Sequence, residues 1–438
     1  MRTGGRRVGS MTCRARLDAF QCLESLLARD PMTAPVSLKR SLSLWLITFY
    51  GLGTILGAGI YVLIGKVAAA AGLYAPVAFL VAALLAGFSA FSYAELSARF
   101  PKSAGEALYV EEGMHLRGLS ILVGGLIILT GIVSAATIAN GFVGYLHVFV
   151  AIPDWVAITV VVLGLGVLAA WGIRESVLAA TAITVFEVGG LIFILVVAGG
   201  SLGQLPERLP ELLPPLDAGI WQGILLGAAL AFYAFIGFED MVNVAEEVKD
   251  PQRNLPRAIL LALGISTLLY LLVALTAVLA LPPEELATSR APLALIYTHT
   301  TGDSPVVISL ISMFAVVNGA LIQIIMSSRV LYGMSRAGWL HAALGNVHPF
   351  TRTPLLATAL VTLVVLALAL WLPLETLAHI TSFIMLIVFS LINLSLLRIK
   401  RRDPRPSGVR VIPMWIPWAG FLSSSAFVLY QLVTMVAW

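Results

Sequence analysis

Two apolar stretches of the chain contain glycine at a depth where a membrane helix would have to break. Gly57-Ala58-Gly59 lies in the middle of the apolar run 46–65, and Gly237 lies near the end of a second run, 218–242. Glycine is a poor helix former, and unwinding inside hydrocarbon leaves peptide N–H and C=O groups unpaired at roughly several kcal/mol each. The two stretches therefore predict broken helices whose free peptide groups bind a solute or an ion at mid-membrane.

The elements that carry these breaks belong to a chain with the composition of a membrane protein. Of its 438 residues 59% are hydrophobic and 11% are charged, which is unlike a soluble domain. Segments of about 20 or more apolar residues are long enough to cross a lipid bilayer. Eleven ranges meet that test: 41–66, 76–98, 118–150, 154–171, 176–200, 218–242, 256–280, 304–334, 354–372, 375–397 and 412–437.

The basic residues predict how these spans are oriented in the cell membrane. If the N-terminus is cytoplasmic, 24 of the 27 Lys and Arg residues fall on the cytoplasmic side, and Lys66, Arg208 and Arg290 lie outside. The net charge of +4 reports this bias and does not indicate a nucleic-acid partner. Residues 1–40, which hold both cysteines, are expected to form a disordered cytoplasmic tail. Met32 is an alternative start, so residues 1–31 need not be expressed.

The positions of the two breaks predict an internal repeat. They fall on the first and sixth spans, so five spans separate equivalent features and the two halves have opposite orientation. We expect an all-α polytopic protein with a ten-helix core over 41–400, built from repeats 41–200 and 218–397. One further span, 411–438, follows the core.

Four sequence motifs resemble the amino acid–polyamine–organocation superfamily of transporters, whose fold is the LeuT-type five-plus-five inverted repeat. Ile55-Leu-Gly-Ala-Gly-Ile-Tyr61 lies in the first span, and Tyr93-Ala-Glu-Leu-Ser-Ala-Arg-Phe-Pro-Lys-Ser-Ala-Gly-Glu106 runs into the first cytoplasmic loop. Phe235-Ile-Gly-Phe-Glu239 leads to 245–256, and Ser327-Ser-Arg-Val-Leu-Tyr-Gly-Met-Ser335 ends the eighth span. The resemblance implies a permease that moves amino acids by alternating access.

An amino acid is a zwitterion, so burying it requires partners for both charges. The N–H groups of Ala58, Gly59 and Ile60 begin a half-helix and are suited to a carboxylate, which Gly57 and Gly59 allow to approach. Carbonyl groups near both breaks are suited to the ammonium group. The expected carbonyl ligands are Ile55, Leu56, Tyr233, Ala234 and Ile236. By resemblance, Phe235 closes over the substrate as a gate.

Glu187 and Glu239 are carboxyl groups at membrane depth, where an ionised side chain costs roughly 2.5 to 3.5 kcal/mol. By resemblance, Glu239 belongs to the inner gate, and Glu187 stands where related branches carry a lysine. Glu187 is then a proton carrier, a cation ligand together with carbonyls near Gly53 and the hydroxyls of Ser327 or Ser328, or a neutral structural acid.

The same sequence argues against other classes of function. No Gly-x-Ser-x-Gly, His-Glu-x-x-His or Walker motif is present, and the six histidines are scattered, so we expect no enzyme activity, catalytic residue, metal or cofactor. A channel or a membrane sensor is a less favoured alternative. Within transport, coupling to protons or exchange is favoured over coupling to sodium, and polyamines or other organic cations are alternative substrates.

Overall fold

The computed structural model describes residues 40, 42–57, 59–102, 105–171, 176–336, 338–348, 351 and 353–436. Residues 1–39 of the predicted tail, with its two cysteines, lie outside this description, as does the expected ligand residue Ala58. The helices are α2 Leu44–Leu56, α3 Gly59–Ala71, α4 Ala75–Arg99, α5 Gly105–Met114, α6 Arg117–Leu146, α7 Asp154–Trp171, α8 Ser176–Val197, α9 Leu205–Leu212, α10 Ala218–Tyr233, α11 Pro251–Ala280, α12 Pro283–Thr288, α13 Pro292–Thr301, α14 Val306–Arg336, α15 Leu355–Trp371, α16 Leu374–Arg402 and α17 Trp415–Val436.

Short 3-10 helices join some of these elements: η1 Gly72–Tyr74, η2 Gly199–Gln204, η3 Glu239–Glu247 and η4 Ala342–Gly345. The described part of the chain contains no β-strand, and its one isolated bridge joins Leu42 to Val248. Leu42 N–H donates to Glu247 at 3.0 Å, and Lys249 N–H donates to Leu42 at 2.9 Å. These bonds connect the segment before α2 to the segment that follows η3.

Each of the predicted membrane segments coincides with a helix or with consecutive helices. Among the described residues, 6 helical stretches are long and apolar enough to cross a membrane, or up to 7 if a pair bent by 54° at residue 198 counts as one span. Three shorter apolar helices lie within α7, α10 and α15. The all-helical, membrane-spanning class is therefore confirmed, whereas the number of eleven spans stays a prediction.

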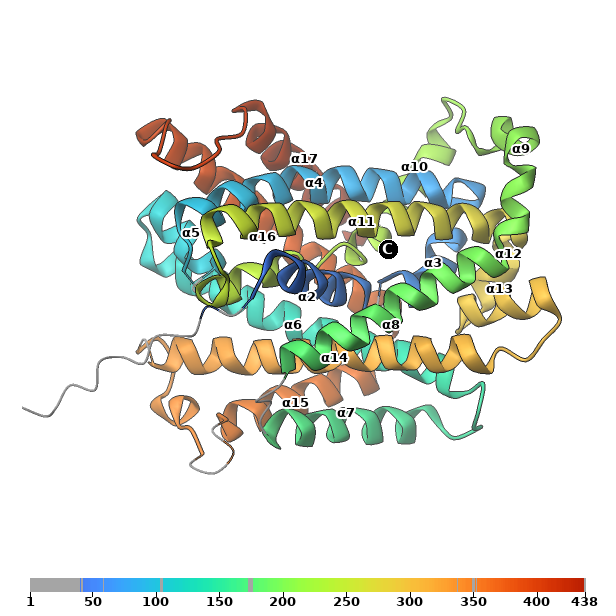
Figure 1. The fold of residues 1–438 in the computed structure, drawn as a ribbon, viewed down its shortest axis with the longest axis horizontal. Coiled ribbons are helices and arrows are strands. Elements are labelled where there is room, and N and C mark those ends of the chain that lie inside the picture. Colours follow the sequence, from blue (N-terminus) through green and yellow to red (C-terminus); the bar gives the residue numbers. More distant parts are fainter. Residues whose placement is uncertain are drawn as a thin grey trace, which may run out of the picture. The chain divides into compact units, whose positions relative to one another are not determined.

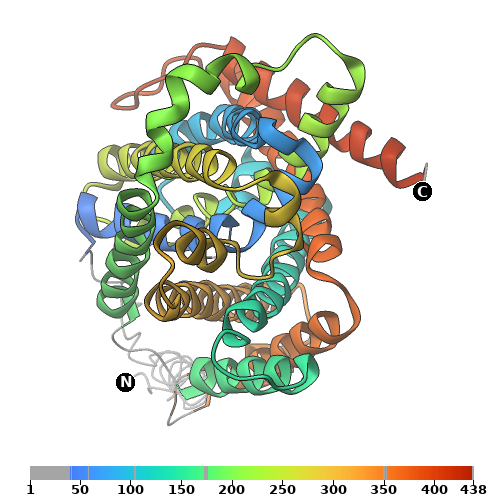
Figure 2. The ribbon, with the colours of Figure 1, turned by 90° about the vertical axis from the view of Figure 1, so that its right-hand side faces the viewer.

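The broken pair α2 and α3 lies inside a ring of other helices (Figure 2). The long helices α4 and α11 run side by side along one side of this pair, and α6 packs against α14 on another (Figure 1). Nearly every side chain of α2 after Thr48 and of α3 before Val67 is buried or half-buried. Helices that are apolar all round are stable only when buried in protein or lipid, so the ring of helices encloses the break.

The outer helices expose large apolar side chains, and an apolar surface of this extent is unfavourable in water. Leu84, Val160, Phe186, Phe314 and Leu363 are each at least 44% exposed, and they come from α4, α7, α8, α14 and α15. Exposed apolar surface of this extent marks an interaction site or a lipid-facing surface. Together with the helix lengths, it indicates that these helices face hydrocarbon.

Candidate functional site

The first span is interrupted between α2 and α3. Helix α2 begins at Leu44, where the Ser43 hydroxyl accepts from the N–H of Leu46 at 3.4 Å, and it ends at Leu56. Helix α3 starts at Gly59. A Cβ on Gly57 would lie 3.0 Å from the Cα of Gly319, so α14 approaches the break backbone to backbone. A Cβ on Gly319 would in turn lie 3.3 Å from the Cα of Gly57, so both glycines allow this close approach.

The second interruption follows α10, which ends at Tyr233 and continues as turns into η3. Gly237 has φ of +131°, a conformation that side-chain-bearing residues rarely adopt. Its carbonyl accepts from the Thr54 hydroxyl at 2.8 Å. A Cβ on Gly59 would lie 2.3 Å from the Cα of Ala234. The two interruptions, far apart in sequence, are therefore in direct contact.

Tyr270 of α11 joins the two interrupted helices. Its hydroxyl lies 2.8 Å from the carbonyl oxygen of Ile55 and 2.9 Å from that of Ala234. A phenol has one hydrogen to donate, so the two carbonyls share it. Both carbonyls are among the expected ammonium ligands, and here they have a hydroxyl partner. Sequence reasoning missed Tyr270, because a tyrosine inside a long apolar helix gives no signal that separates this contact from ordinary packing.

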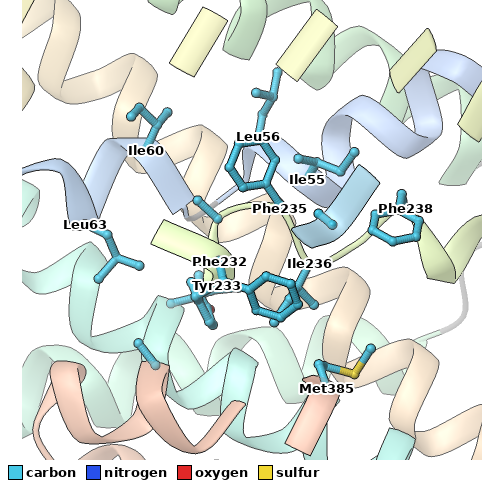
Figure 3. Close-up of a cluster of buried hydrophobic side chains, with 14 of the residues drawn as sticks. Ile55, Leu56, Ile60, Leu63, Phe232, Tyr233, Phe235, Ile236, Phe238 and Met385 are labelled. Carbon is cyan, nitrogen blue, oxygen red and sulfur yellow. The ribbon is translucent and has the colours of Figure 1, made fainter. Parts of the chain in front are cut away.

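Apolar and aromatic side chains fill the space around the contact between the two interruptions (Figure 3). Phe235 is fully buried, and its ring lies 5.1 Å from that of Tyr270 in an edge-on arrangement. Phe232 and Phe238 are also fully buried and both pack against Phe389 of α16, so neither faces lipid. The remaining expected ligand residues of the described chain are buried as well: Ile55, Leu56, Gly57, Gly59, Ile60, Tyr233, Ala234 and Ile236.

Helix α6 contributes polar contacts to this region through Ser134. The Tyr233 hydroxyl lies 3.0 Å from the Ser134 hydroxyl, which connects α10 to α6 next to the second interruption. Asn140, two turns further along α6, instead donates to the carbonyl of Ala369 in α15 at 3.1 Å. Ser134 thus points toward the candidate site, whereas Asn140 packs helices together.

Glu187 is fully buried in α8 and faces α14. Its Oε1 accepts from the Asn318 side-chain amide at 3.0 Å, and its Oε2 has no hydrogen-bond partner among the described residues. A Cβ on Gly53 would lie 3.7 Å from that same amide nitrogen, so Asn318 stands between Glu187 and α2. The structure therefore places Glu187 near the C-terminal end of α2.

The two serines expected near Glu187 make other contacts. The Ser327 hydroxyl donates to the carbonyl of Ile128 at 3.4 Å, and the Ser328 hydroxyl donates to that of Ile325 at 2.8 Å. Asn318, which lies earlier in α14, is the polar side chain that reaches Glu187. The candidate cation ligands are thus separated in this conformation.

Three further carboxyl groups are buried in η3, which follows the second interruption, and in α5. Glu239 accepts from the N–H of Gly237 at 2.9 Å, and Asp240 accepts from the Gln323 side-chain amide at 3.1 Å. Glu106 of α5 lies 3.4 Å from the Tyr93 hydroxyl. Burial, reinforced by the nearby Asp240, raises the pKa of Glu106 to about 8. Across the described residues no group of three or more His, Cys, Asp or Glu is arranged to hold a metal ion.

Two buried helix interruptions define the class, since the described part of the chain is otherwise helical and apolar: a multi-pass membrane protein whose interrupted helices meet in its interior rather than against lipid. The chain belongs to the amino acid permease family, which it matches over residues 42–437. This result confirms the resemblance to the amino acid–polyamine–organocation superfamily. It also makes the protein a transporter and not an enzyme.

Relatives in curated collections agree with this family. An uncharacterized transporter of Mycobacterium tuberculosis is 33% identical over 391 residues, covering 88% of this chain and 86% of its own length. The branched-chain amino acid permease BcaP of Bacillus subtilis is 29% identical, covering 86% of each chain. The methylthioribose transporter of Bacillus subtilis is 28% identical, covering 87% of this chain and 85% of its own.

Proposed function

We propose that this protein is a secondary active transporter that moves amino acids across the cell membrane by alternating access. The N-terminus is cytoplasmic, and the ten-helix core is the five-plus-five inverted repeat. The observation that carries the proposal is the meeting of two helix interruptions at Tyr270, where carbonyls of Ile55 and Ala234 point at one hydroxyl. Free carbonyls and N–H groups at such interruptions are the ligands that transporters of this architecture use.

In this proposal the substrate replaces contacts that the protein makes with itself. The ammonium group takes the carbonyls now held by Tyr270, and the carboxylate takes N–H groups at the start of α3. Because Gly59 packs closely against Ala234, we expect α3 and the segment after α10 to separate when a substrate enters. The hydroxyl of Tyr270 holds the carbonyls when no substrate is present, so neither state leaves them unpaired.

Neutral amino acids with apolar side chains are the favoured substrates. The side chains of Ile55, Ile236 and Phe235, which belong to the interrupted segments, are all buried and apolar. An apolar pocket discriminates against charged side chains through the cost of burying them. The relative BcaP is named for branched-chain amino acids, which fit this description. Glu239 favours a cationic substrate, but its carboxylate already accepts a hydrogen bond from the Gly237 N–H.

Uptake by the purified protein in proteoliposomes tests the transport proposal. The panel contains radiolabelled leucine, lysine, glutamate, a polyamine and methylthioribose, each with and without imposed pH and sodium gradients. We expect saturable leucine uptake that excess unlabelled branched-chain amino acid inhibits. Transport of methylthioribose or of the polyamine without any amino acid would contradict the proposed substrate class, and unsaturable flux would indicate a channel.

Glu187 is proposed to couple transport to protons. A buried carboxyl with one unpartnered oxygen, next to α2, is set to gain or lose a proton as the surrounding helices open to water. In Glu187→Gln the amide oxygen can still accept the hydrogen bond from Asn318. The new side chain cannot gain or lose a proton. We expect this variant to bind substrate but to lose both the pH dependence of uptake and accumulation against a gradient.

The matched control for Glu187 is Glu284→Gln, which removes an exposed carboxyl in α12. Its uptake should keep the wild-type pH profile. If Glu187→Gln still concentrates substrate under a proton gradient, the acid is structural. If sodium alone drives wild-type uptake and the variant loses that response, Glu187 is a cation ligand.

A further inference from the structure

A cavity of about 650 Å³ lies where the ends of α4, α5 and α16 meet the start of α11. This end of the molecule is the one predicted to face the cytoplasm. Three arginines line the cavity: Arg99, Arg402 and Arg405. Two carboxylates, Glu112 and Asp403, also line it, so the cationic groups outnumber the anionic ones. Asp403 is paired with Arg99 at 3.4 Å, so the positive excess lies on Arg402 and Arg405 against Glu112, and it favours an anion.

The arginines of this cavity differ in how far their charge is already compensated. Arg99 donates twice to the buried carboxylate of Glu95, at 2.9 and 2.7 Å, and Glu95 also receives Lys400 at 2.8 Å. Arg402 donates to the carbonyls of Glu112 at 3.1 Å and Gly113 at 3.2 Å. Carbonyls accept hydrogen bonds without neutralising charge, so Arg402 keeps its full positive charge at the cavity wall.

Arg405 is the freest cation of the cavity. It is exposed, and it makes no hydrogen bond or ion pair with any residue that the structure describes. Gln252, at the start of α11, likewise lines the cavity with an amide that has no described partner. A guanidinium group offers a planar pair of donors that matches a phosphate, and an amide adds another donor.

The wall of the cavity contains a backbone conformation that needs support. His115 has φ of +54°, in the left-handed region that is uncommon for residues other than glycine. Its side chain lies 2.5 Å from Arg402, which holds the turn after α5 in place. Strained residues supported by their surroundings cluster at binding sites. Arg402 is thus both a charge in the cavity and the support of its wall.

The cavity lies close in sequence to the residues that mark the edge of the membrane. Helix α17 begins at Trp415, which is 62% exposed, only a few residues after the cavity residue Val409. Exposed tryptophans concentrate at the level of lipid headgroups. Basic pockets at the cytoplasmic ends of membrane helices are suited to anionic headgroups.

We propose that this cavity is a binding site for a phosphate-bearing anion, supplied either by an anionic lipid headgroup of the adjacent leaflet or by free phosphate in solution. Arg405 and Arg402 contact the phosphate, and Gln252 donates a hydrogen bond to it. The bound anion connects the end of α16 to the start of α11. It stabilises the folded protein without entering the substrate site.

Thermal unfolding of the purified full chain in neutral detergent tests this site. The probes are short-chain phosphatidylglycerol, short-chain phosphatidylcholine and inorganic phosphate, each titrated at ionic strength matched with sodium chloride. A ligand that binds the folded protein raises the unfolding midpoint in a saturable way. We expect phosphatidylglycerol to raise it by several degrees and phosphatidylcholine to leave it unchanged.

Two variants separate a specific site from general attraction of anions. Arg405→Ala and Arg401→Ala remove one positive charge each from neighbouring exposed positions, and Arg401 does not line the cavity. We expect Arg405→Ala to raise the half-saturating concentration of phosphatidylglycerol at least tenfold and Arg401→Ala to change it less than twofold. Gln252→Ala, which leaves the net charge unchanged, should raise this concentration severalfold.

The outcomes decide both the site and its ligand. A saturable effect of phosphatidylglycerol alone assigns a lipid headgroup, and an equal effect of inorganic phosphate assigns a soluble anion. No saturable shift with either probe, a shift that sodium chloride reproduces, or equal weakening by Arg401→Ala and Arg405→Ala would overturn the proposal.

Discussion

At the scale of single residues, Tyr270 has the contact most specific to the proposed mechanism. One hydroxyl spans carbonyls from two interrupted helices, so it connects them only while they are close together. Leaving a buried carbonyl without a donor costs roughly 1–3 kcal/mol. A residue in this position affects how easily the closed arrangement forms as well as how the substrate is held.

Tyr270→Phe removes this hydroxyl and keeps the ring against which Phe235 packs. We expect the maximal rate of uptake to fall about tenfold, since roughly 1.4 kcal/mol corresponds to a factor of ten. Tyr297→Phe is the control, because the Tyr297 hydroxyl makes no hydrogen bond with a described residue. Radiolabelled uptake measures both variants. Equal rates for Tyr270→Phe and the wild type would remove the hydroxyl from the mechanism.

Gly59→Ala tests the contact between the two interruptions. The new methyl group would lie 2.3 Å from the Cα of Ala234, so the backbone of one segment must shift. We expect uptake to fall at least tenfold while the protein still inserts into the membrane, because misplacing ligand groups by about 1 Å costs on the order of 100-fold in well-oriented sites. Gly189→Ala in α8 meets nothing within 4 Å and should transport normally. Normal uptake by Gly59→Ala would contradict the proposed site.

At the scale of elements, α5 and η3 meet through buried acids. Glu106 of α5 faces Tyr93 of α4, Tyr109 of its own helix, and Glu239 and Asp240 of η3. The pKa of Glu106 is about 8 in the folded protein, against 4.5 for an unperturbed glutamate. Between these values the folded state holds a proton that the unfolded chain has released. Stability attributable to Glu106 is therefore present below about pH 4.5 and is lost as the pH rises toward 8.

Glu106→Gln removes this titration. We expect the thermal midpoint of the wild-type protein to fall more steeply than that of the variant between pH 5 and 8, with a difference of about 1.4 kcal/mol or less per pH unit. Glu111→Gln, an exposed acid on the same helix, should follow the wild type. Parallel midpoint curves for Glu106→Gln and the wild type would show that Glu106 is ionised when folded.

At the scale of the whole molecule, the basic residues predict that the cavity end faces the cytoplasm. In a background of Cys13→Ser and Cys22→Ser, single substitutions Asp303→Cys and Ser407→Cys place thiols in exposed loops at opposite ends. We expect a membrane-impermeant maleimide to label intact cells carrying Asp303→Cys and to leave Ser407→Cys unlabelled. Both should be labelled after permeabilisation. The reverse pattern would invert the orientation and move the anion cavity to the outside.

The features that the sequence predicts correctly are those that depend on local composition. Apolar length predicts helices, because unpaired peptide groups are costly in hydrocarbon, and each expected span coincides with helical structure. Glycine at 57, 59 and 237 marks interruptions for the same reason, and the structure ends α2 at Leu56 and α10 at Tyr233. Four short motifs were enough to indicate the family, which the match over residues 42–437 confirms.

Which polar groups meet depends on how the helices pack, and the sequence did not predict it. Tyr270 reaching Ile55, and Asn318 rather than Ser327 reaching Glu187, depend on how α8, α11 and α14 pack around α2. Helical periodicity gives the face on which a side chain lies, but it does not give the rotation and height of the neighbouring helix. Asn318 and Ser327 are both polar residues of α14, and a hydrogen bond with a reach of about 3 Å is made by the one that the packing brings next to Glu187.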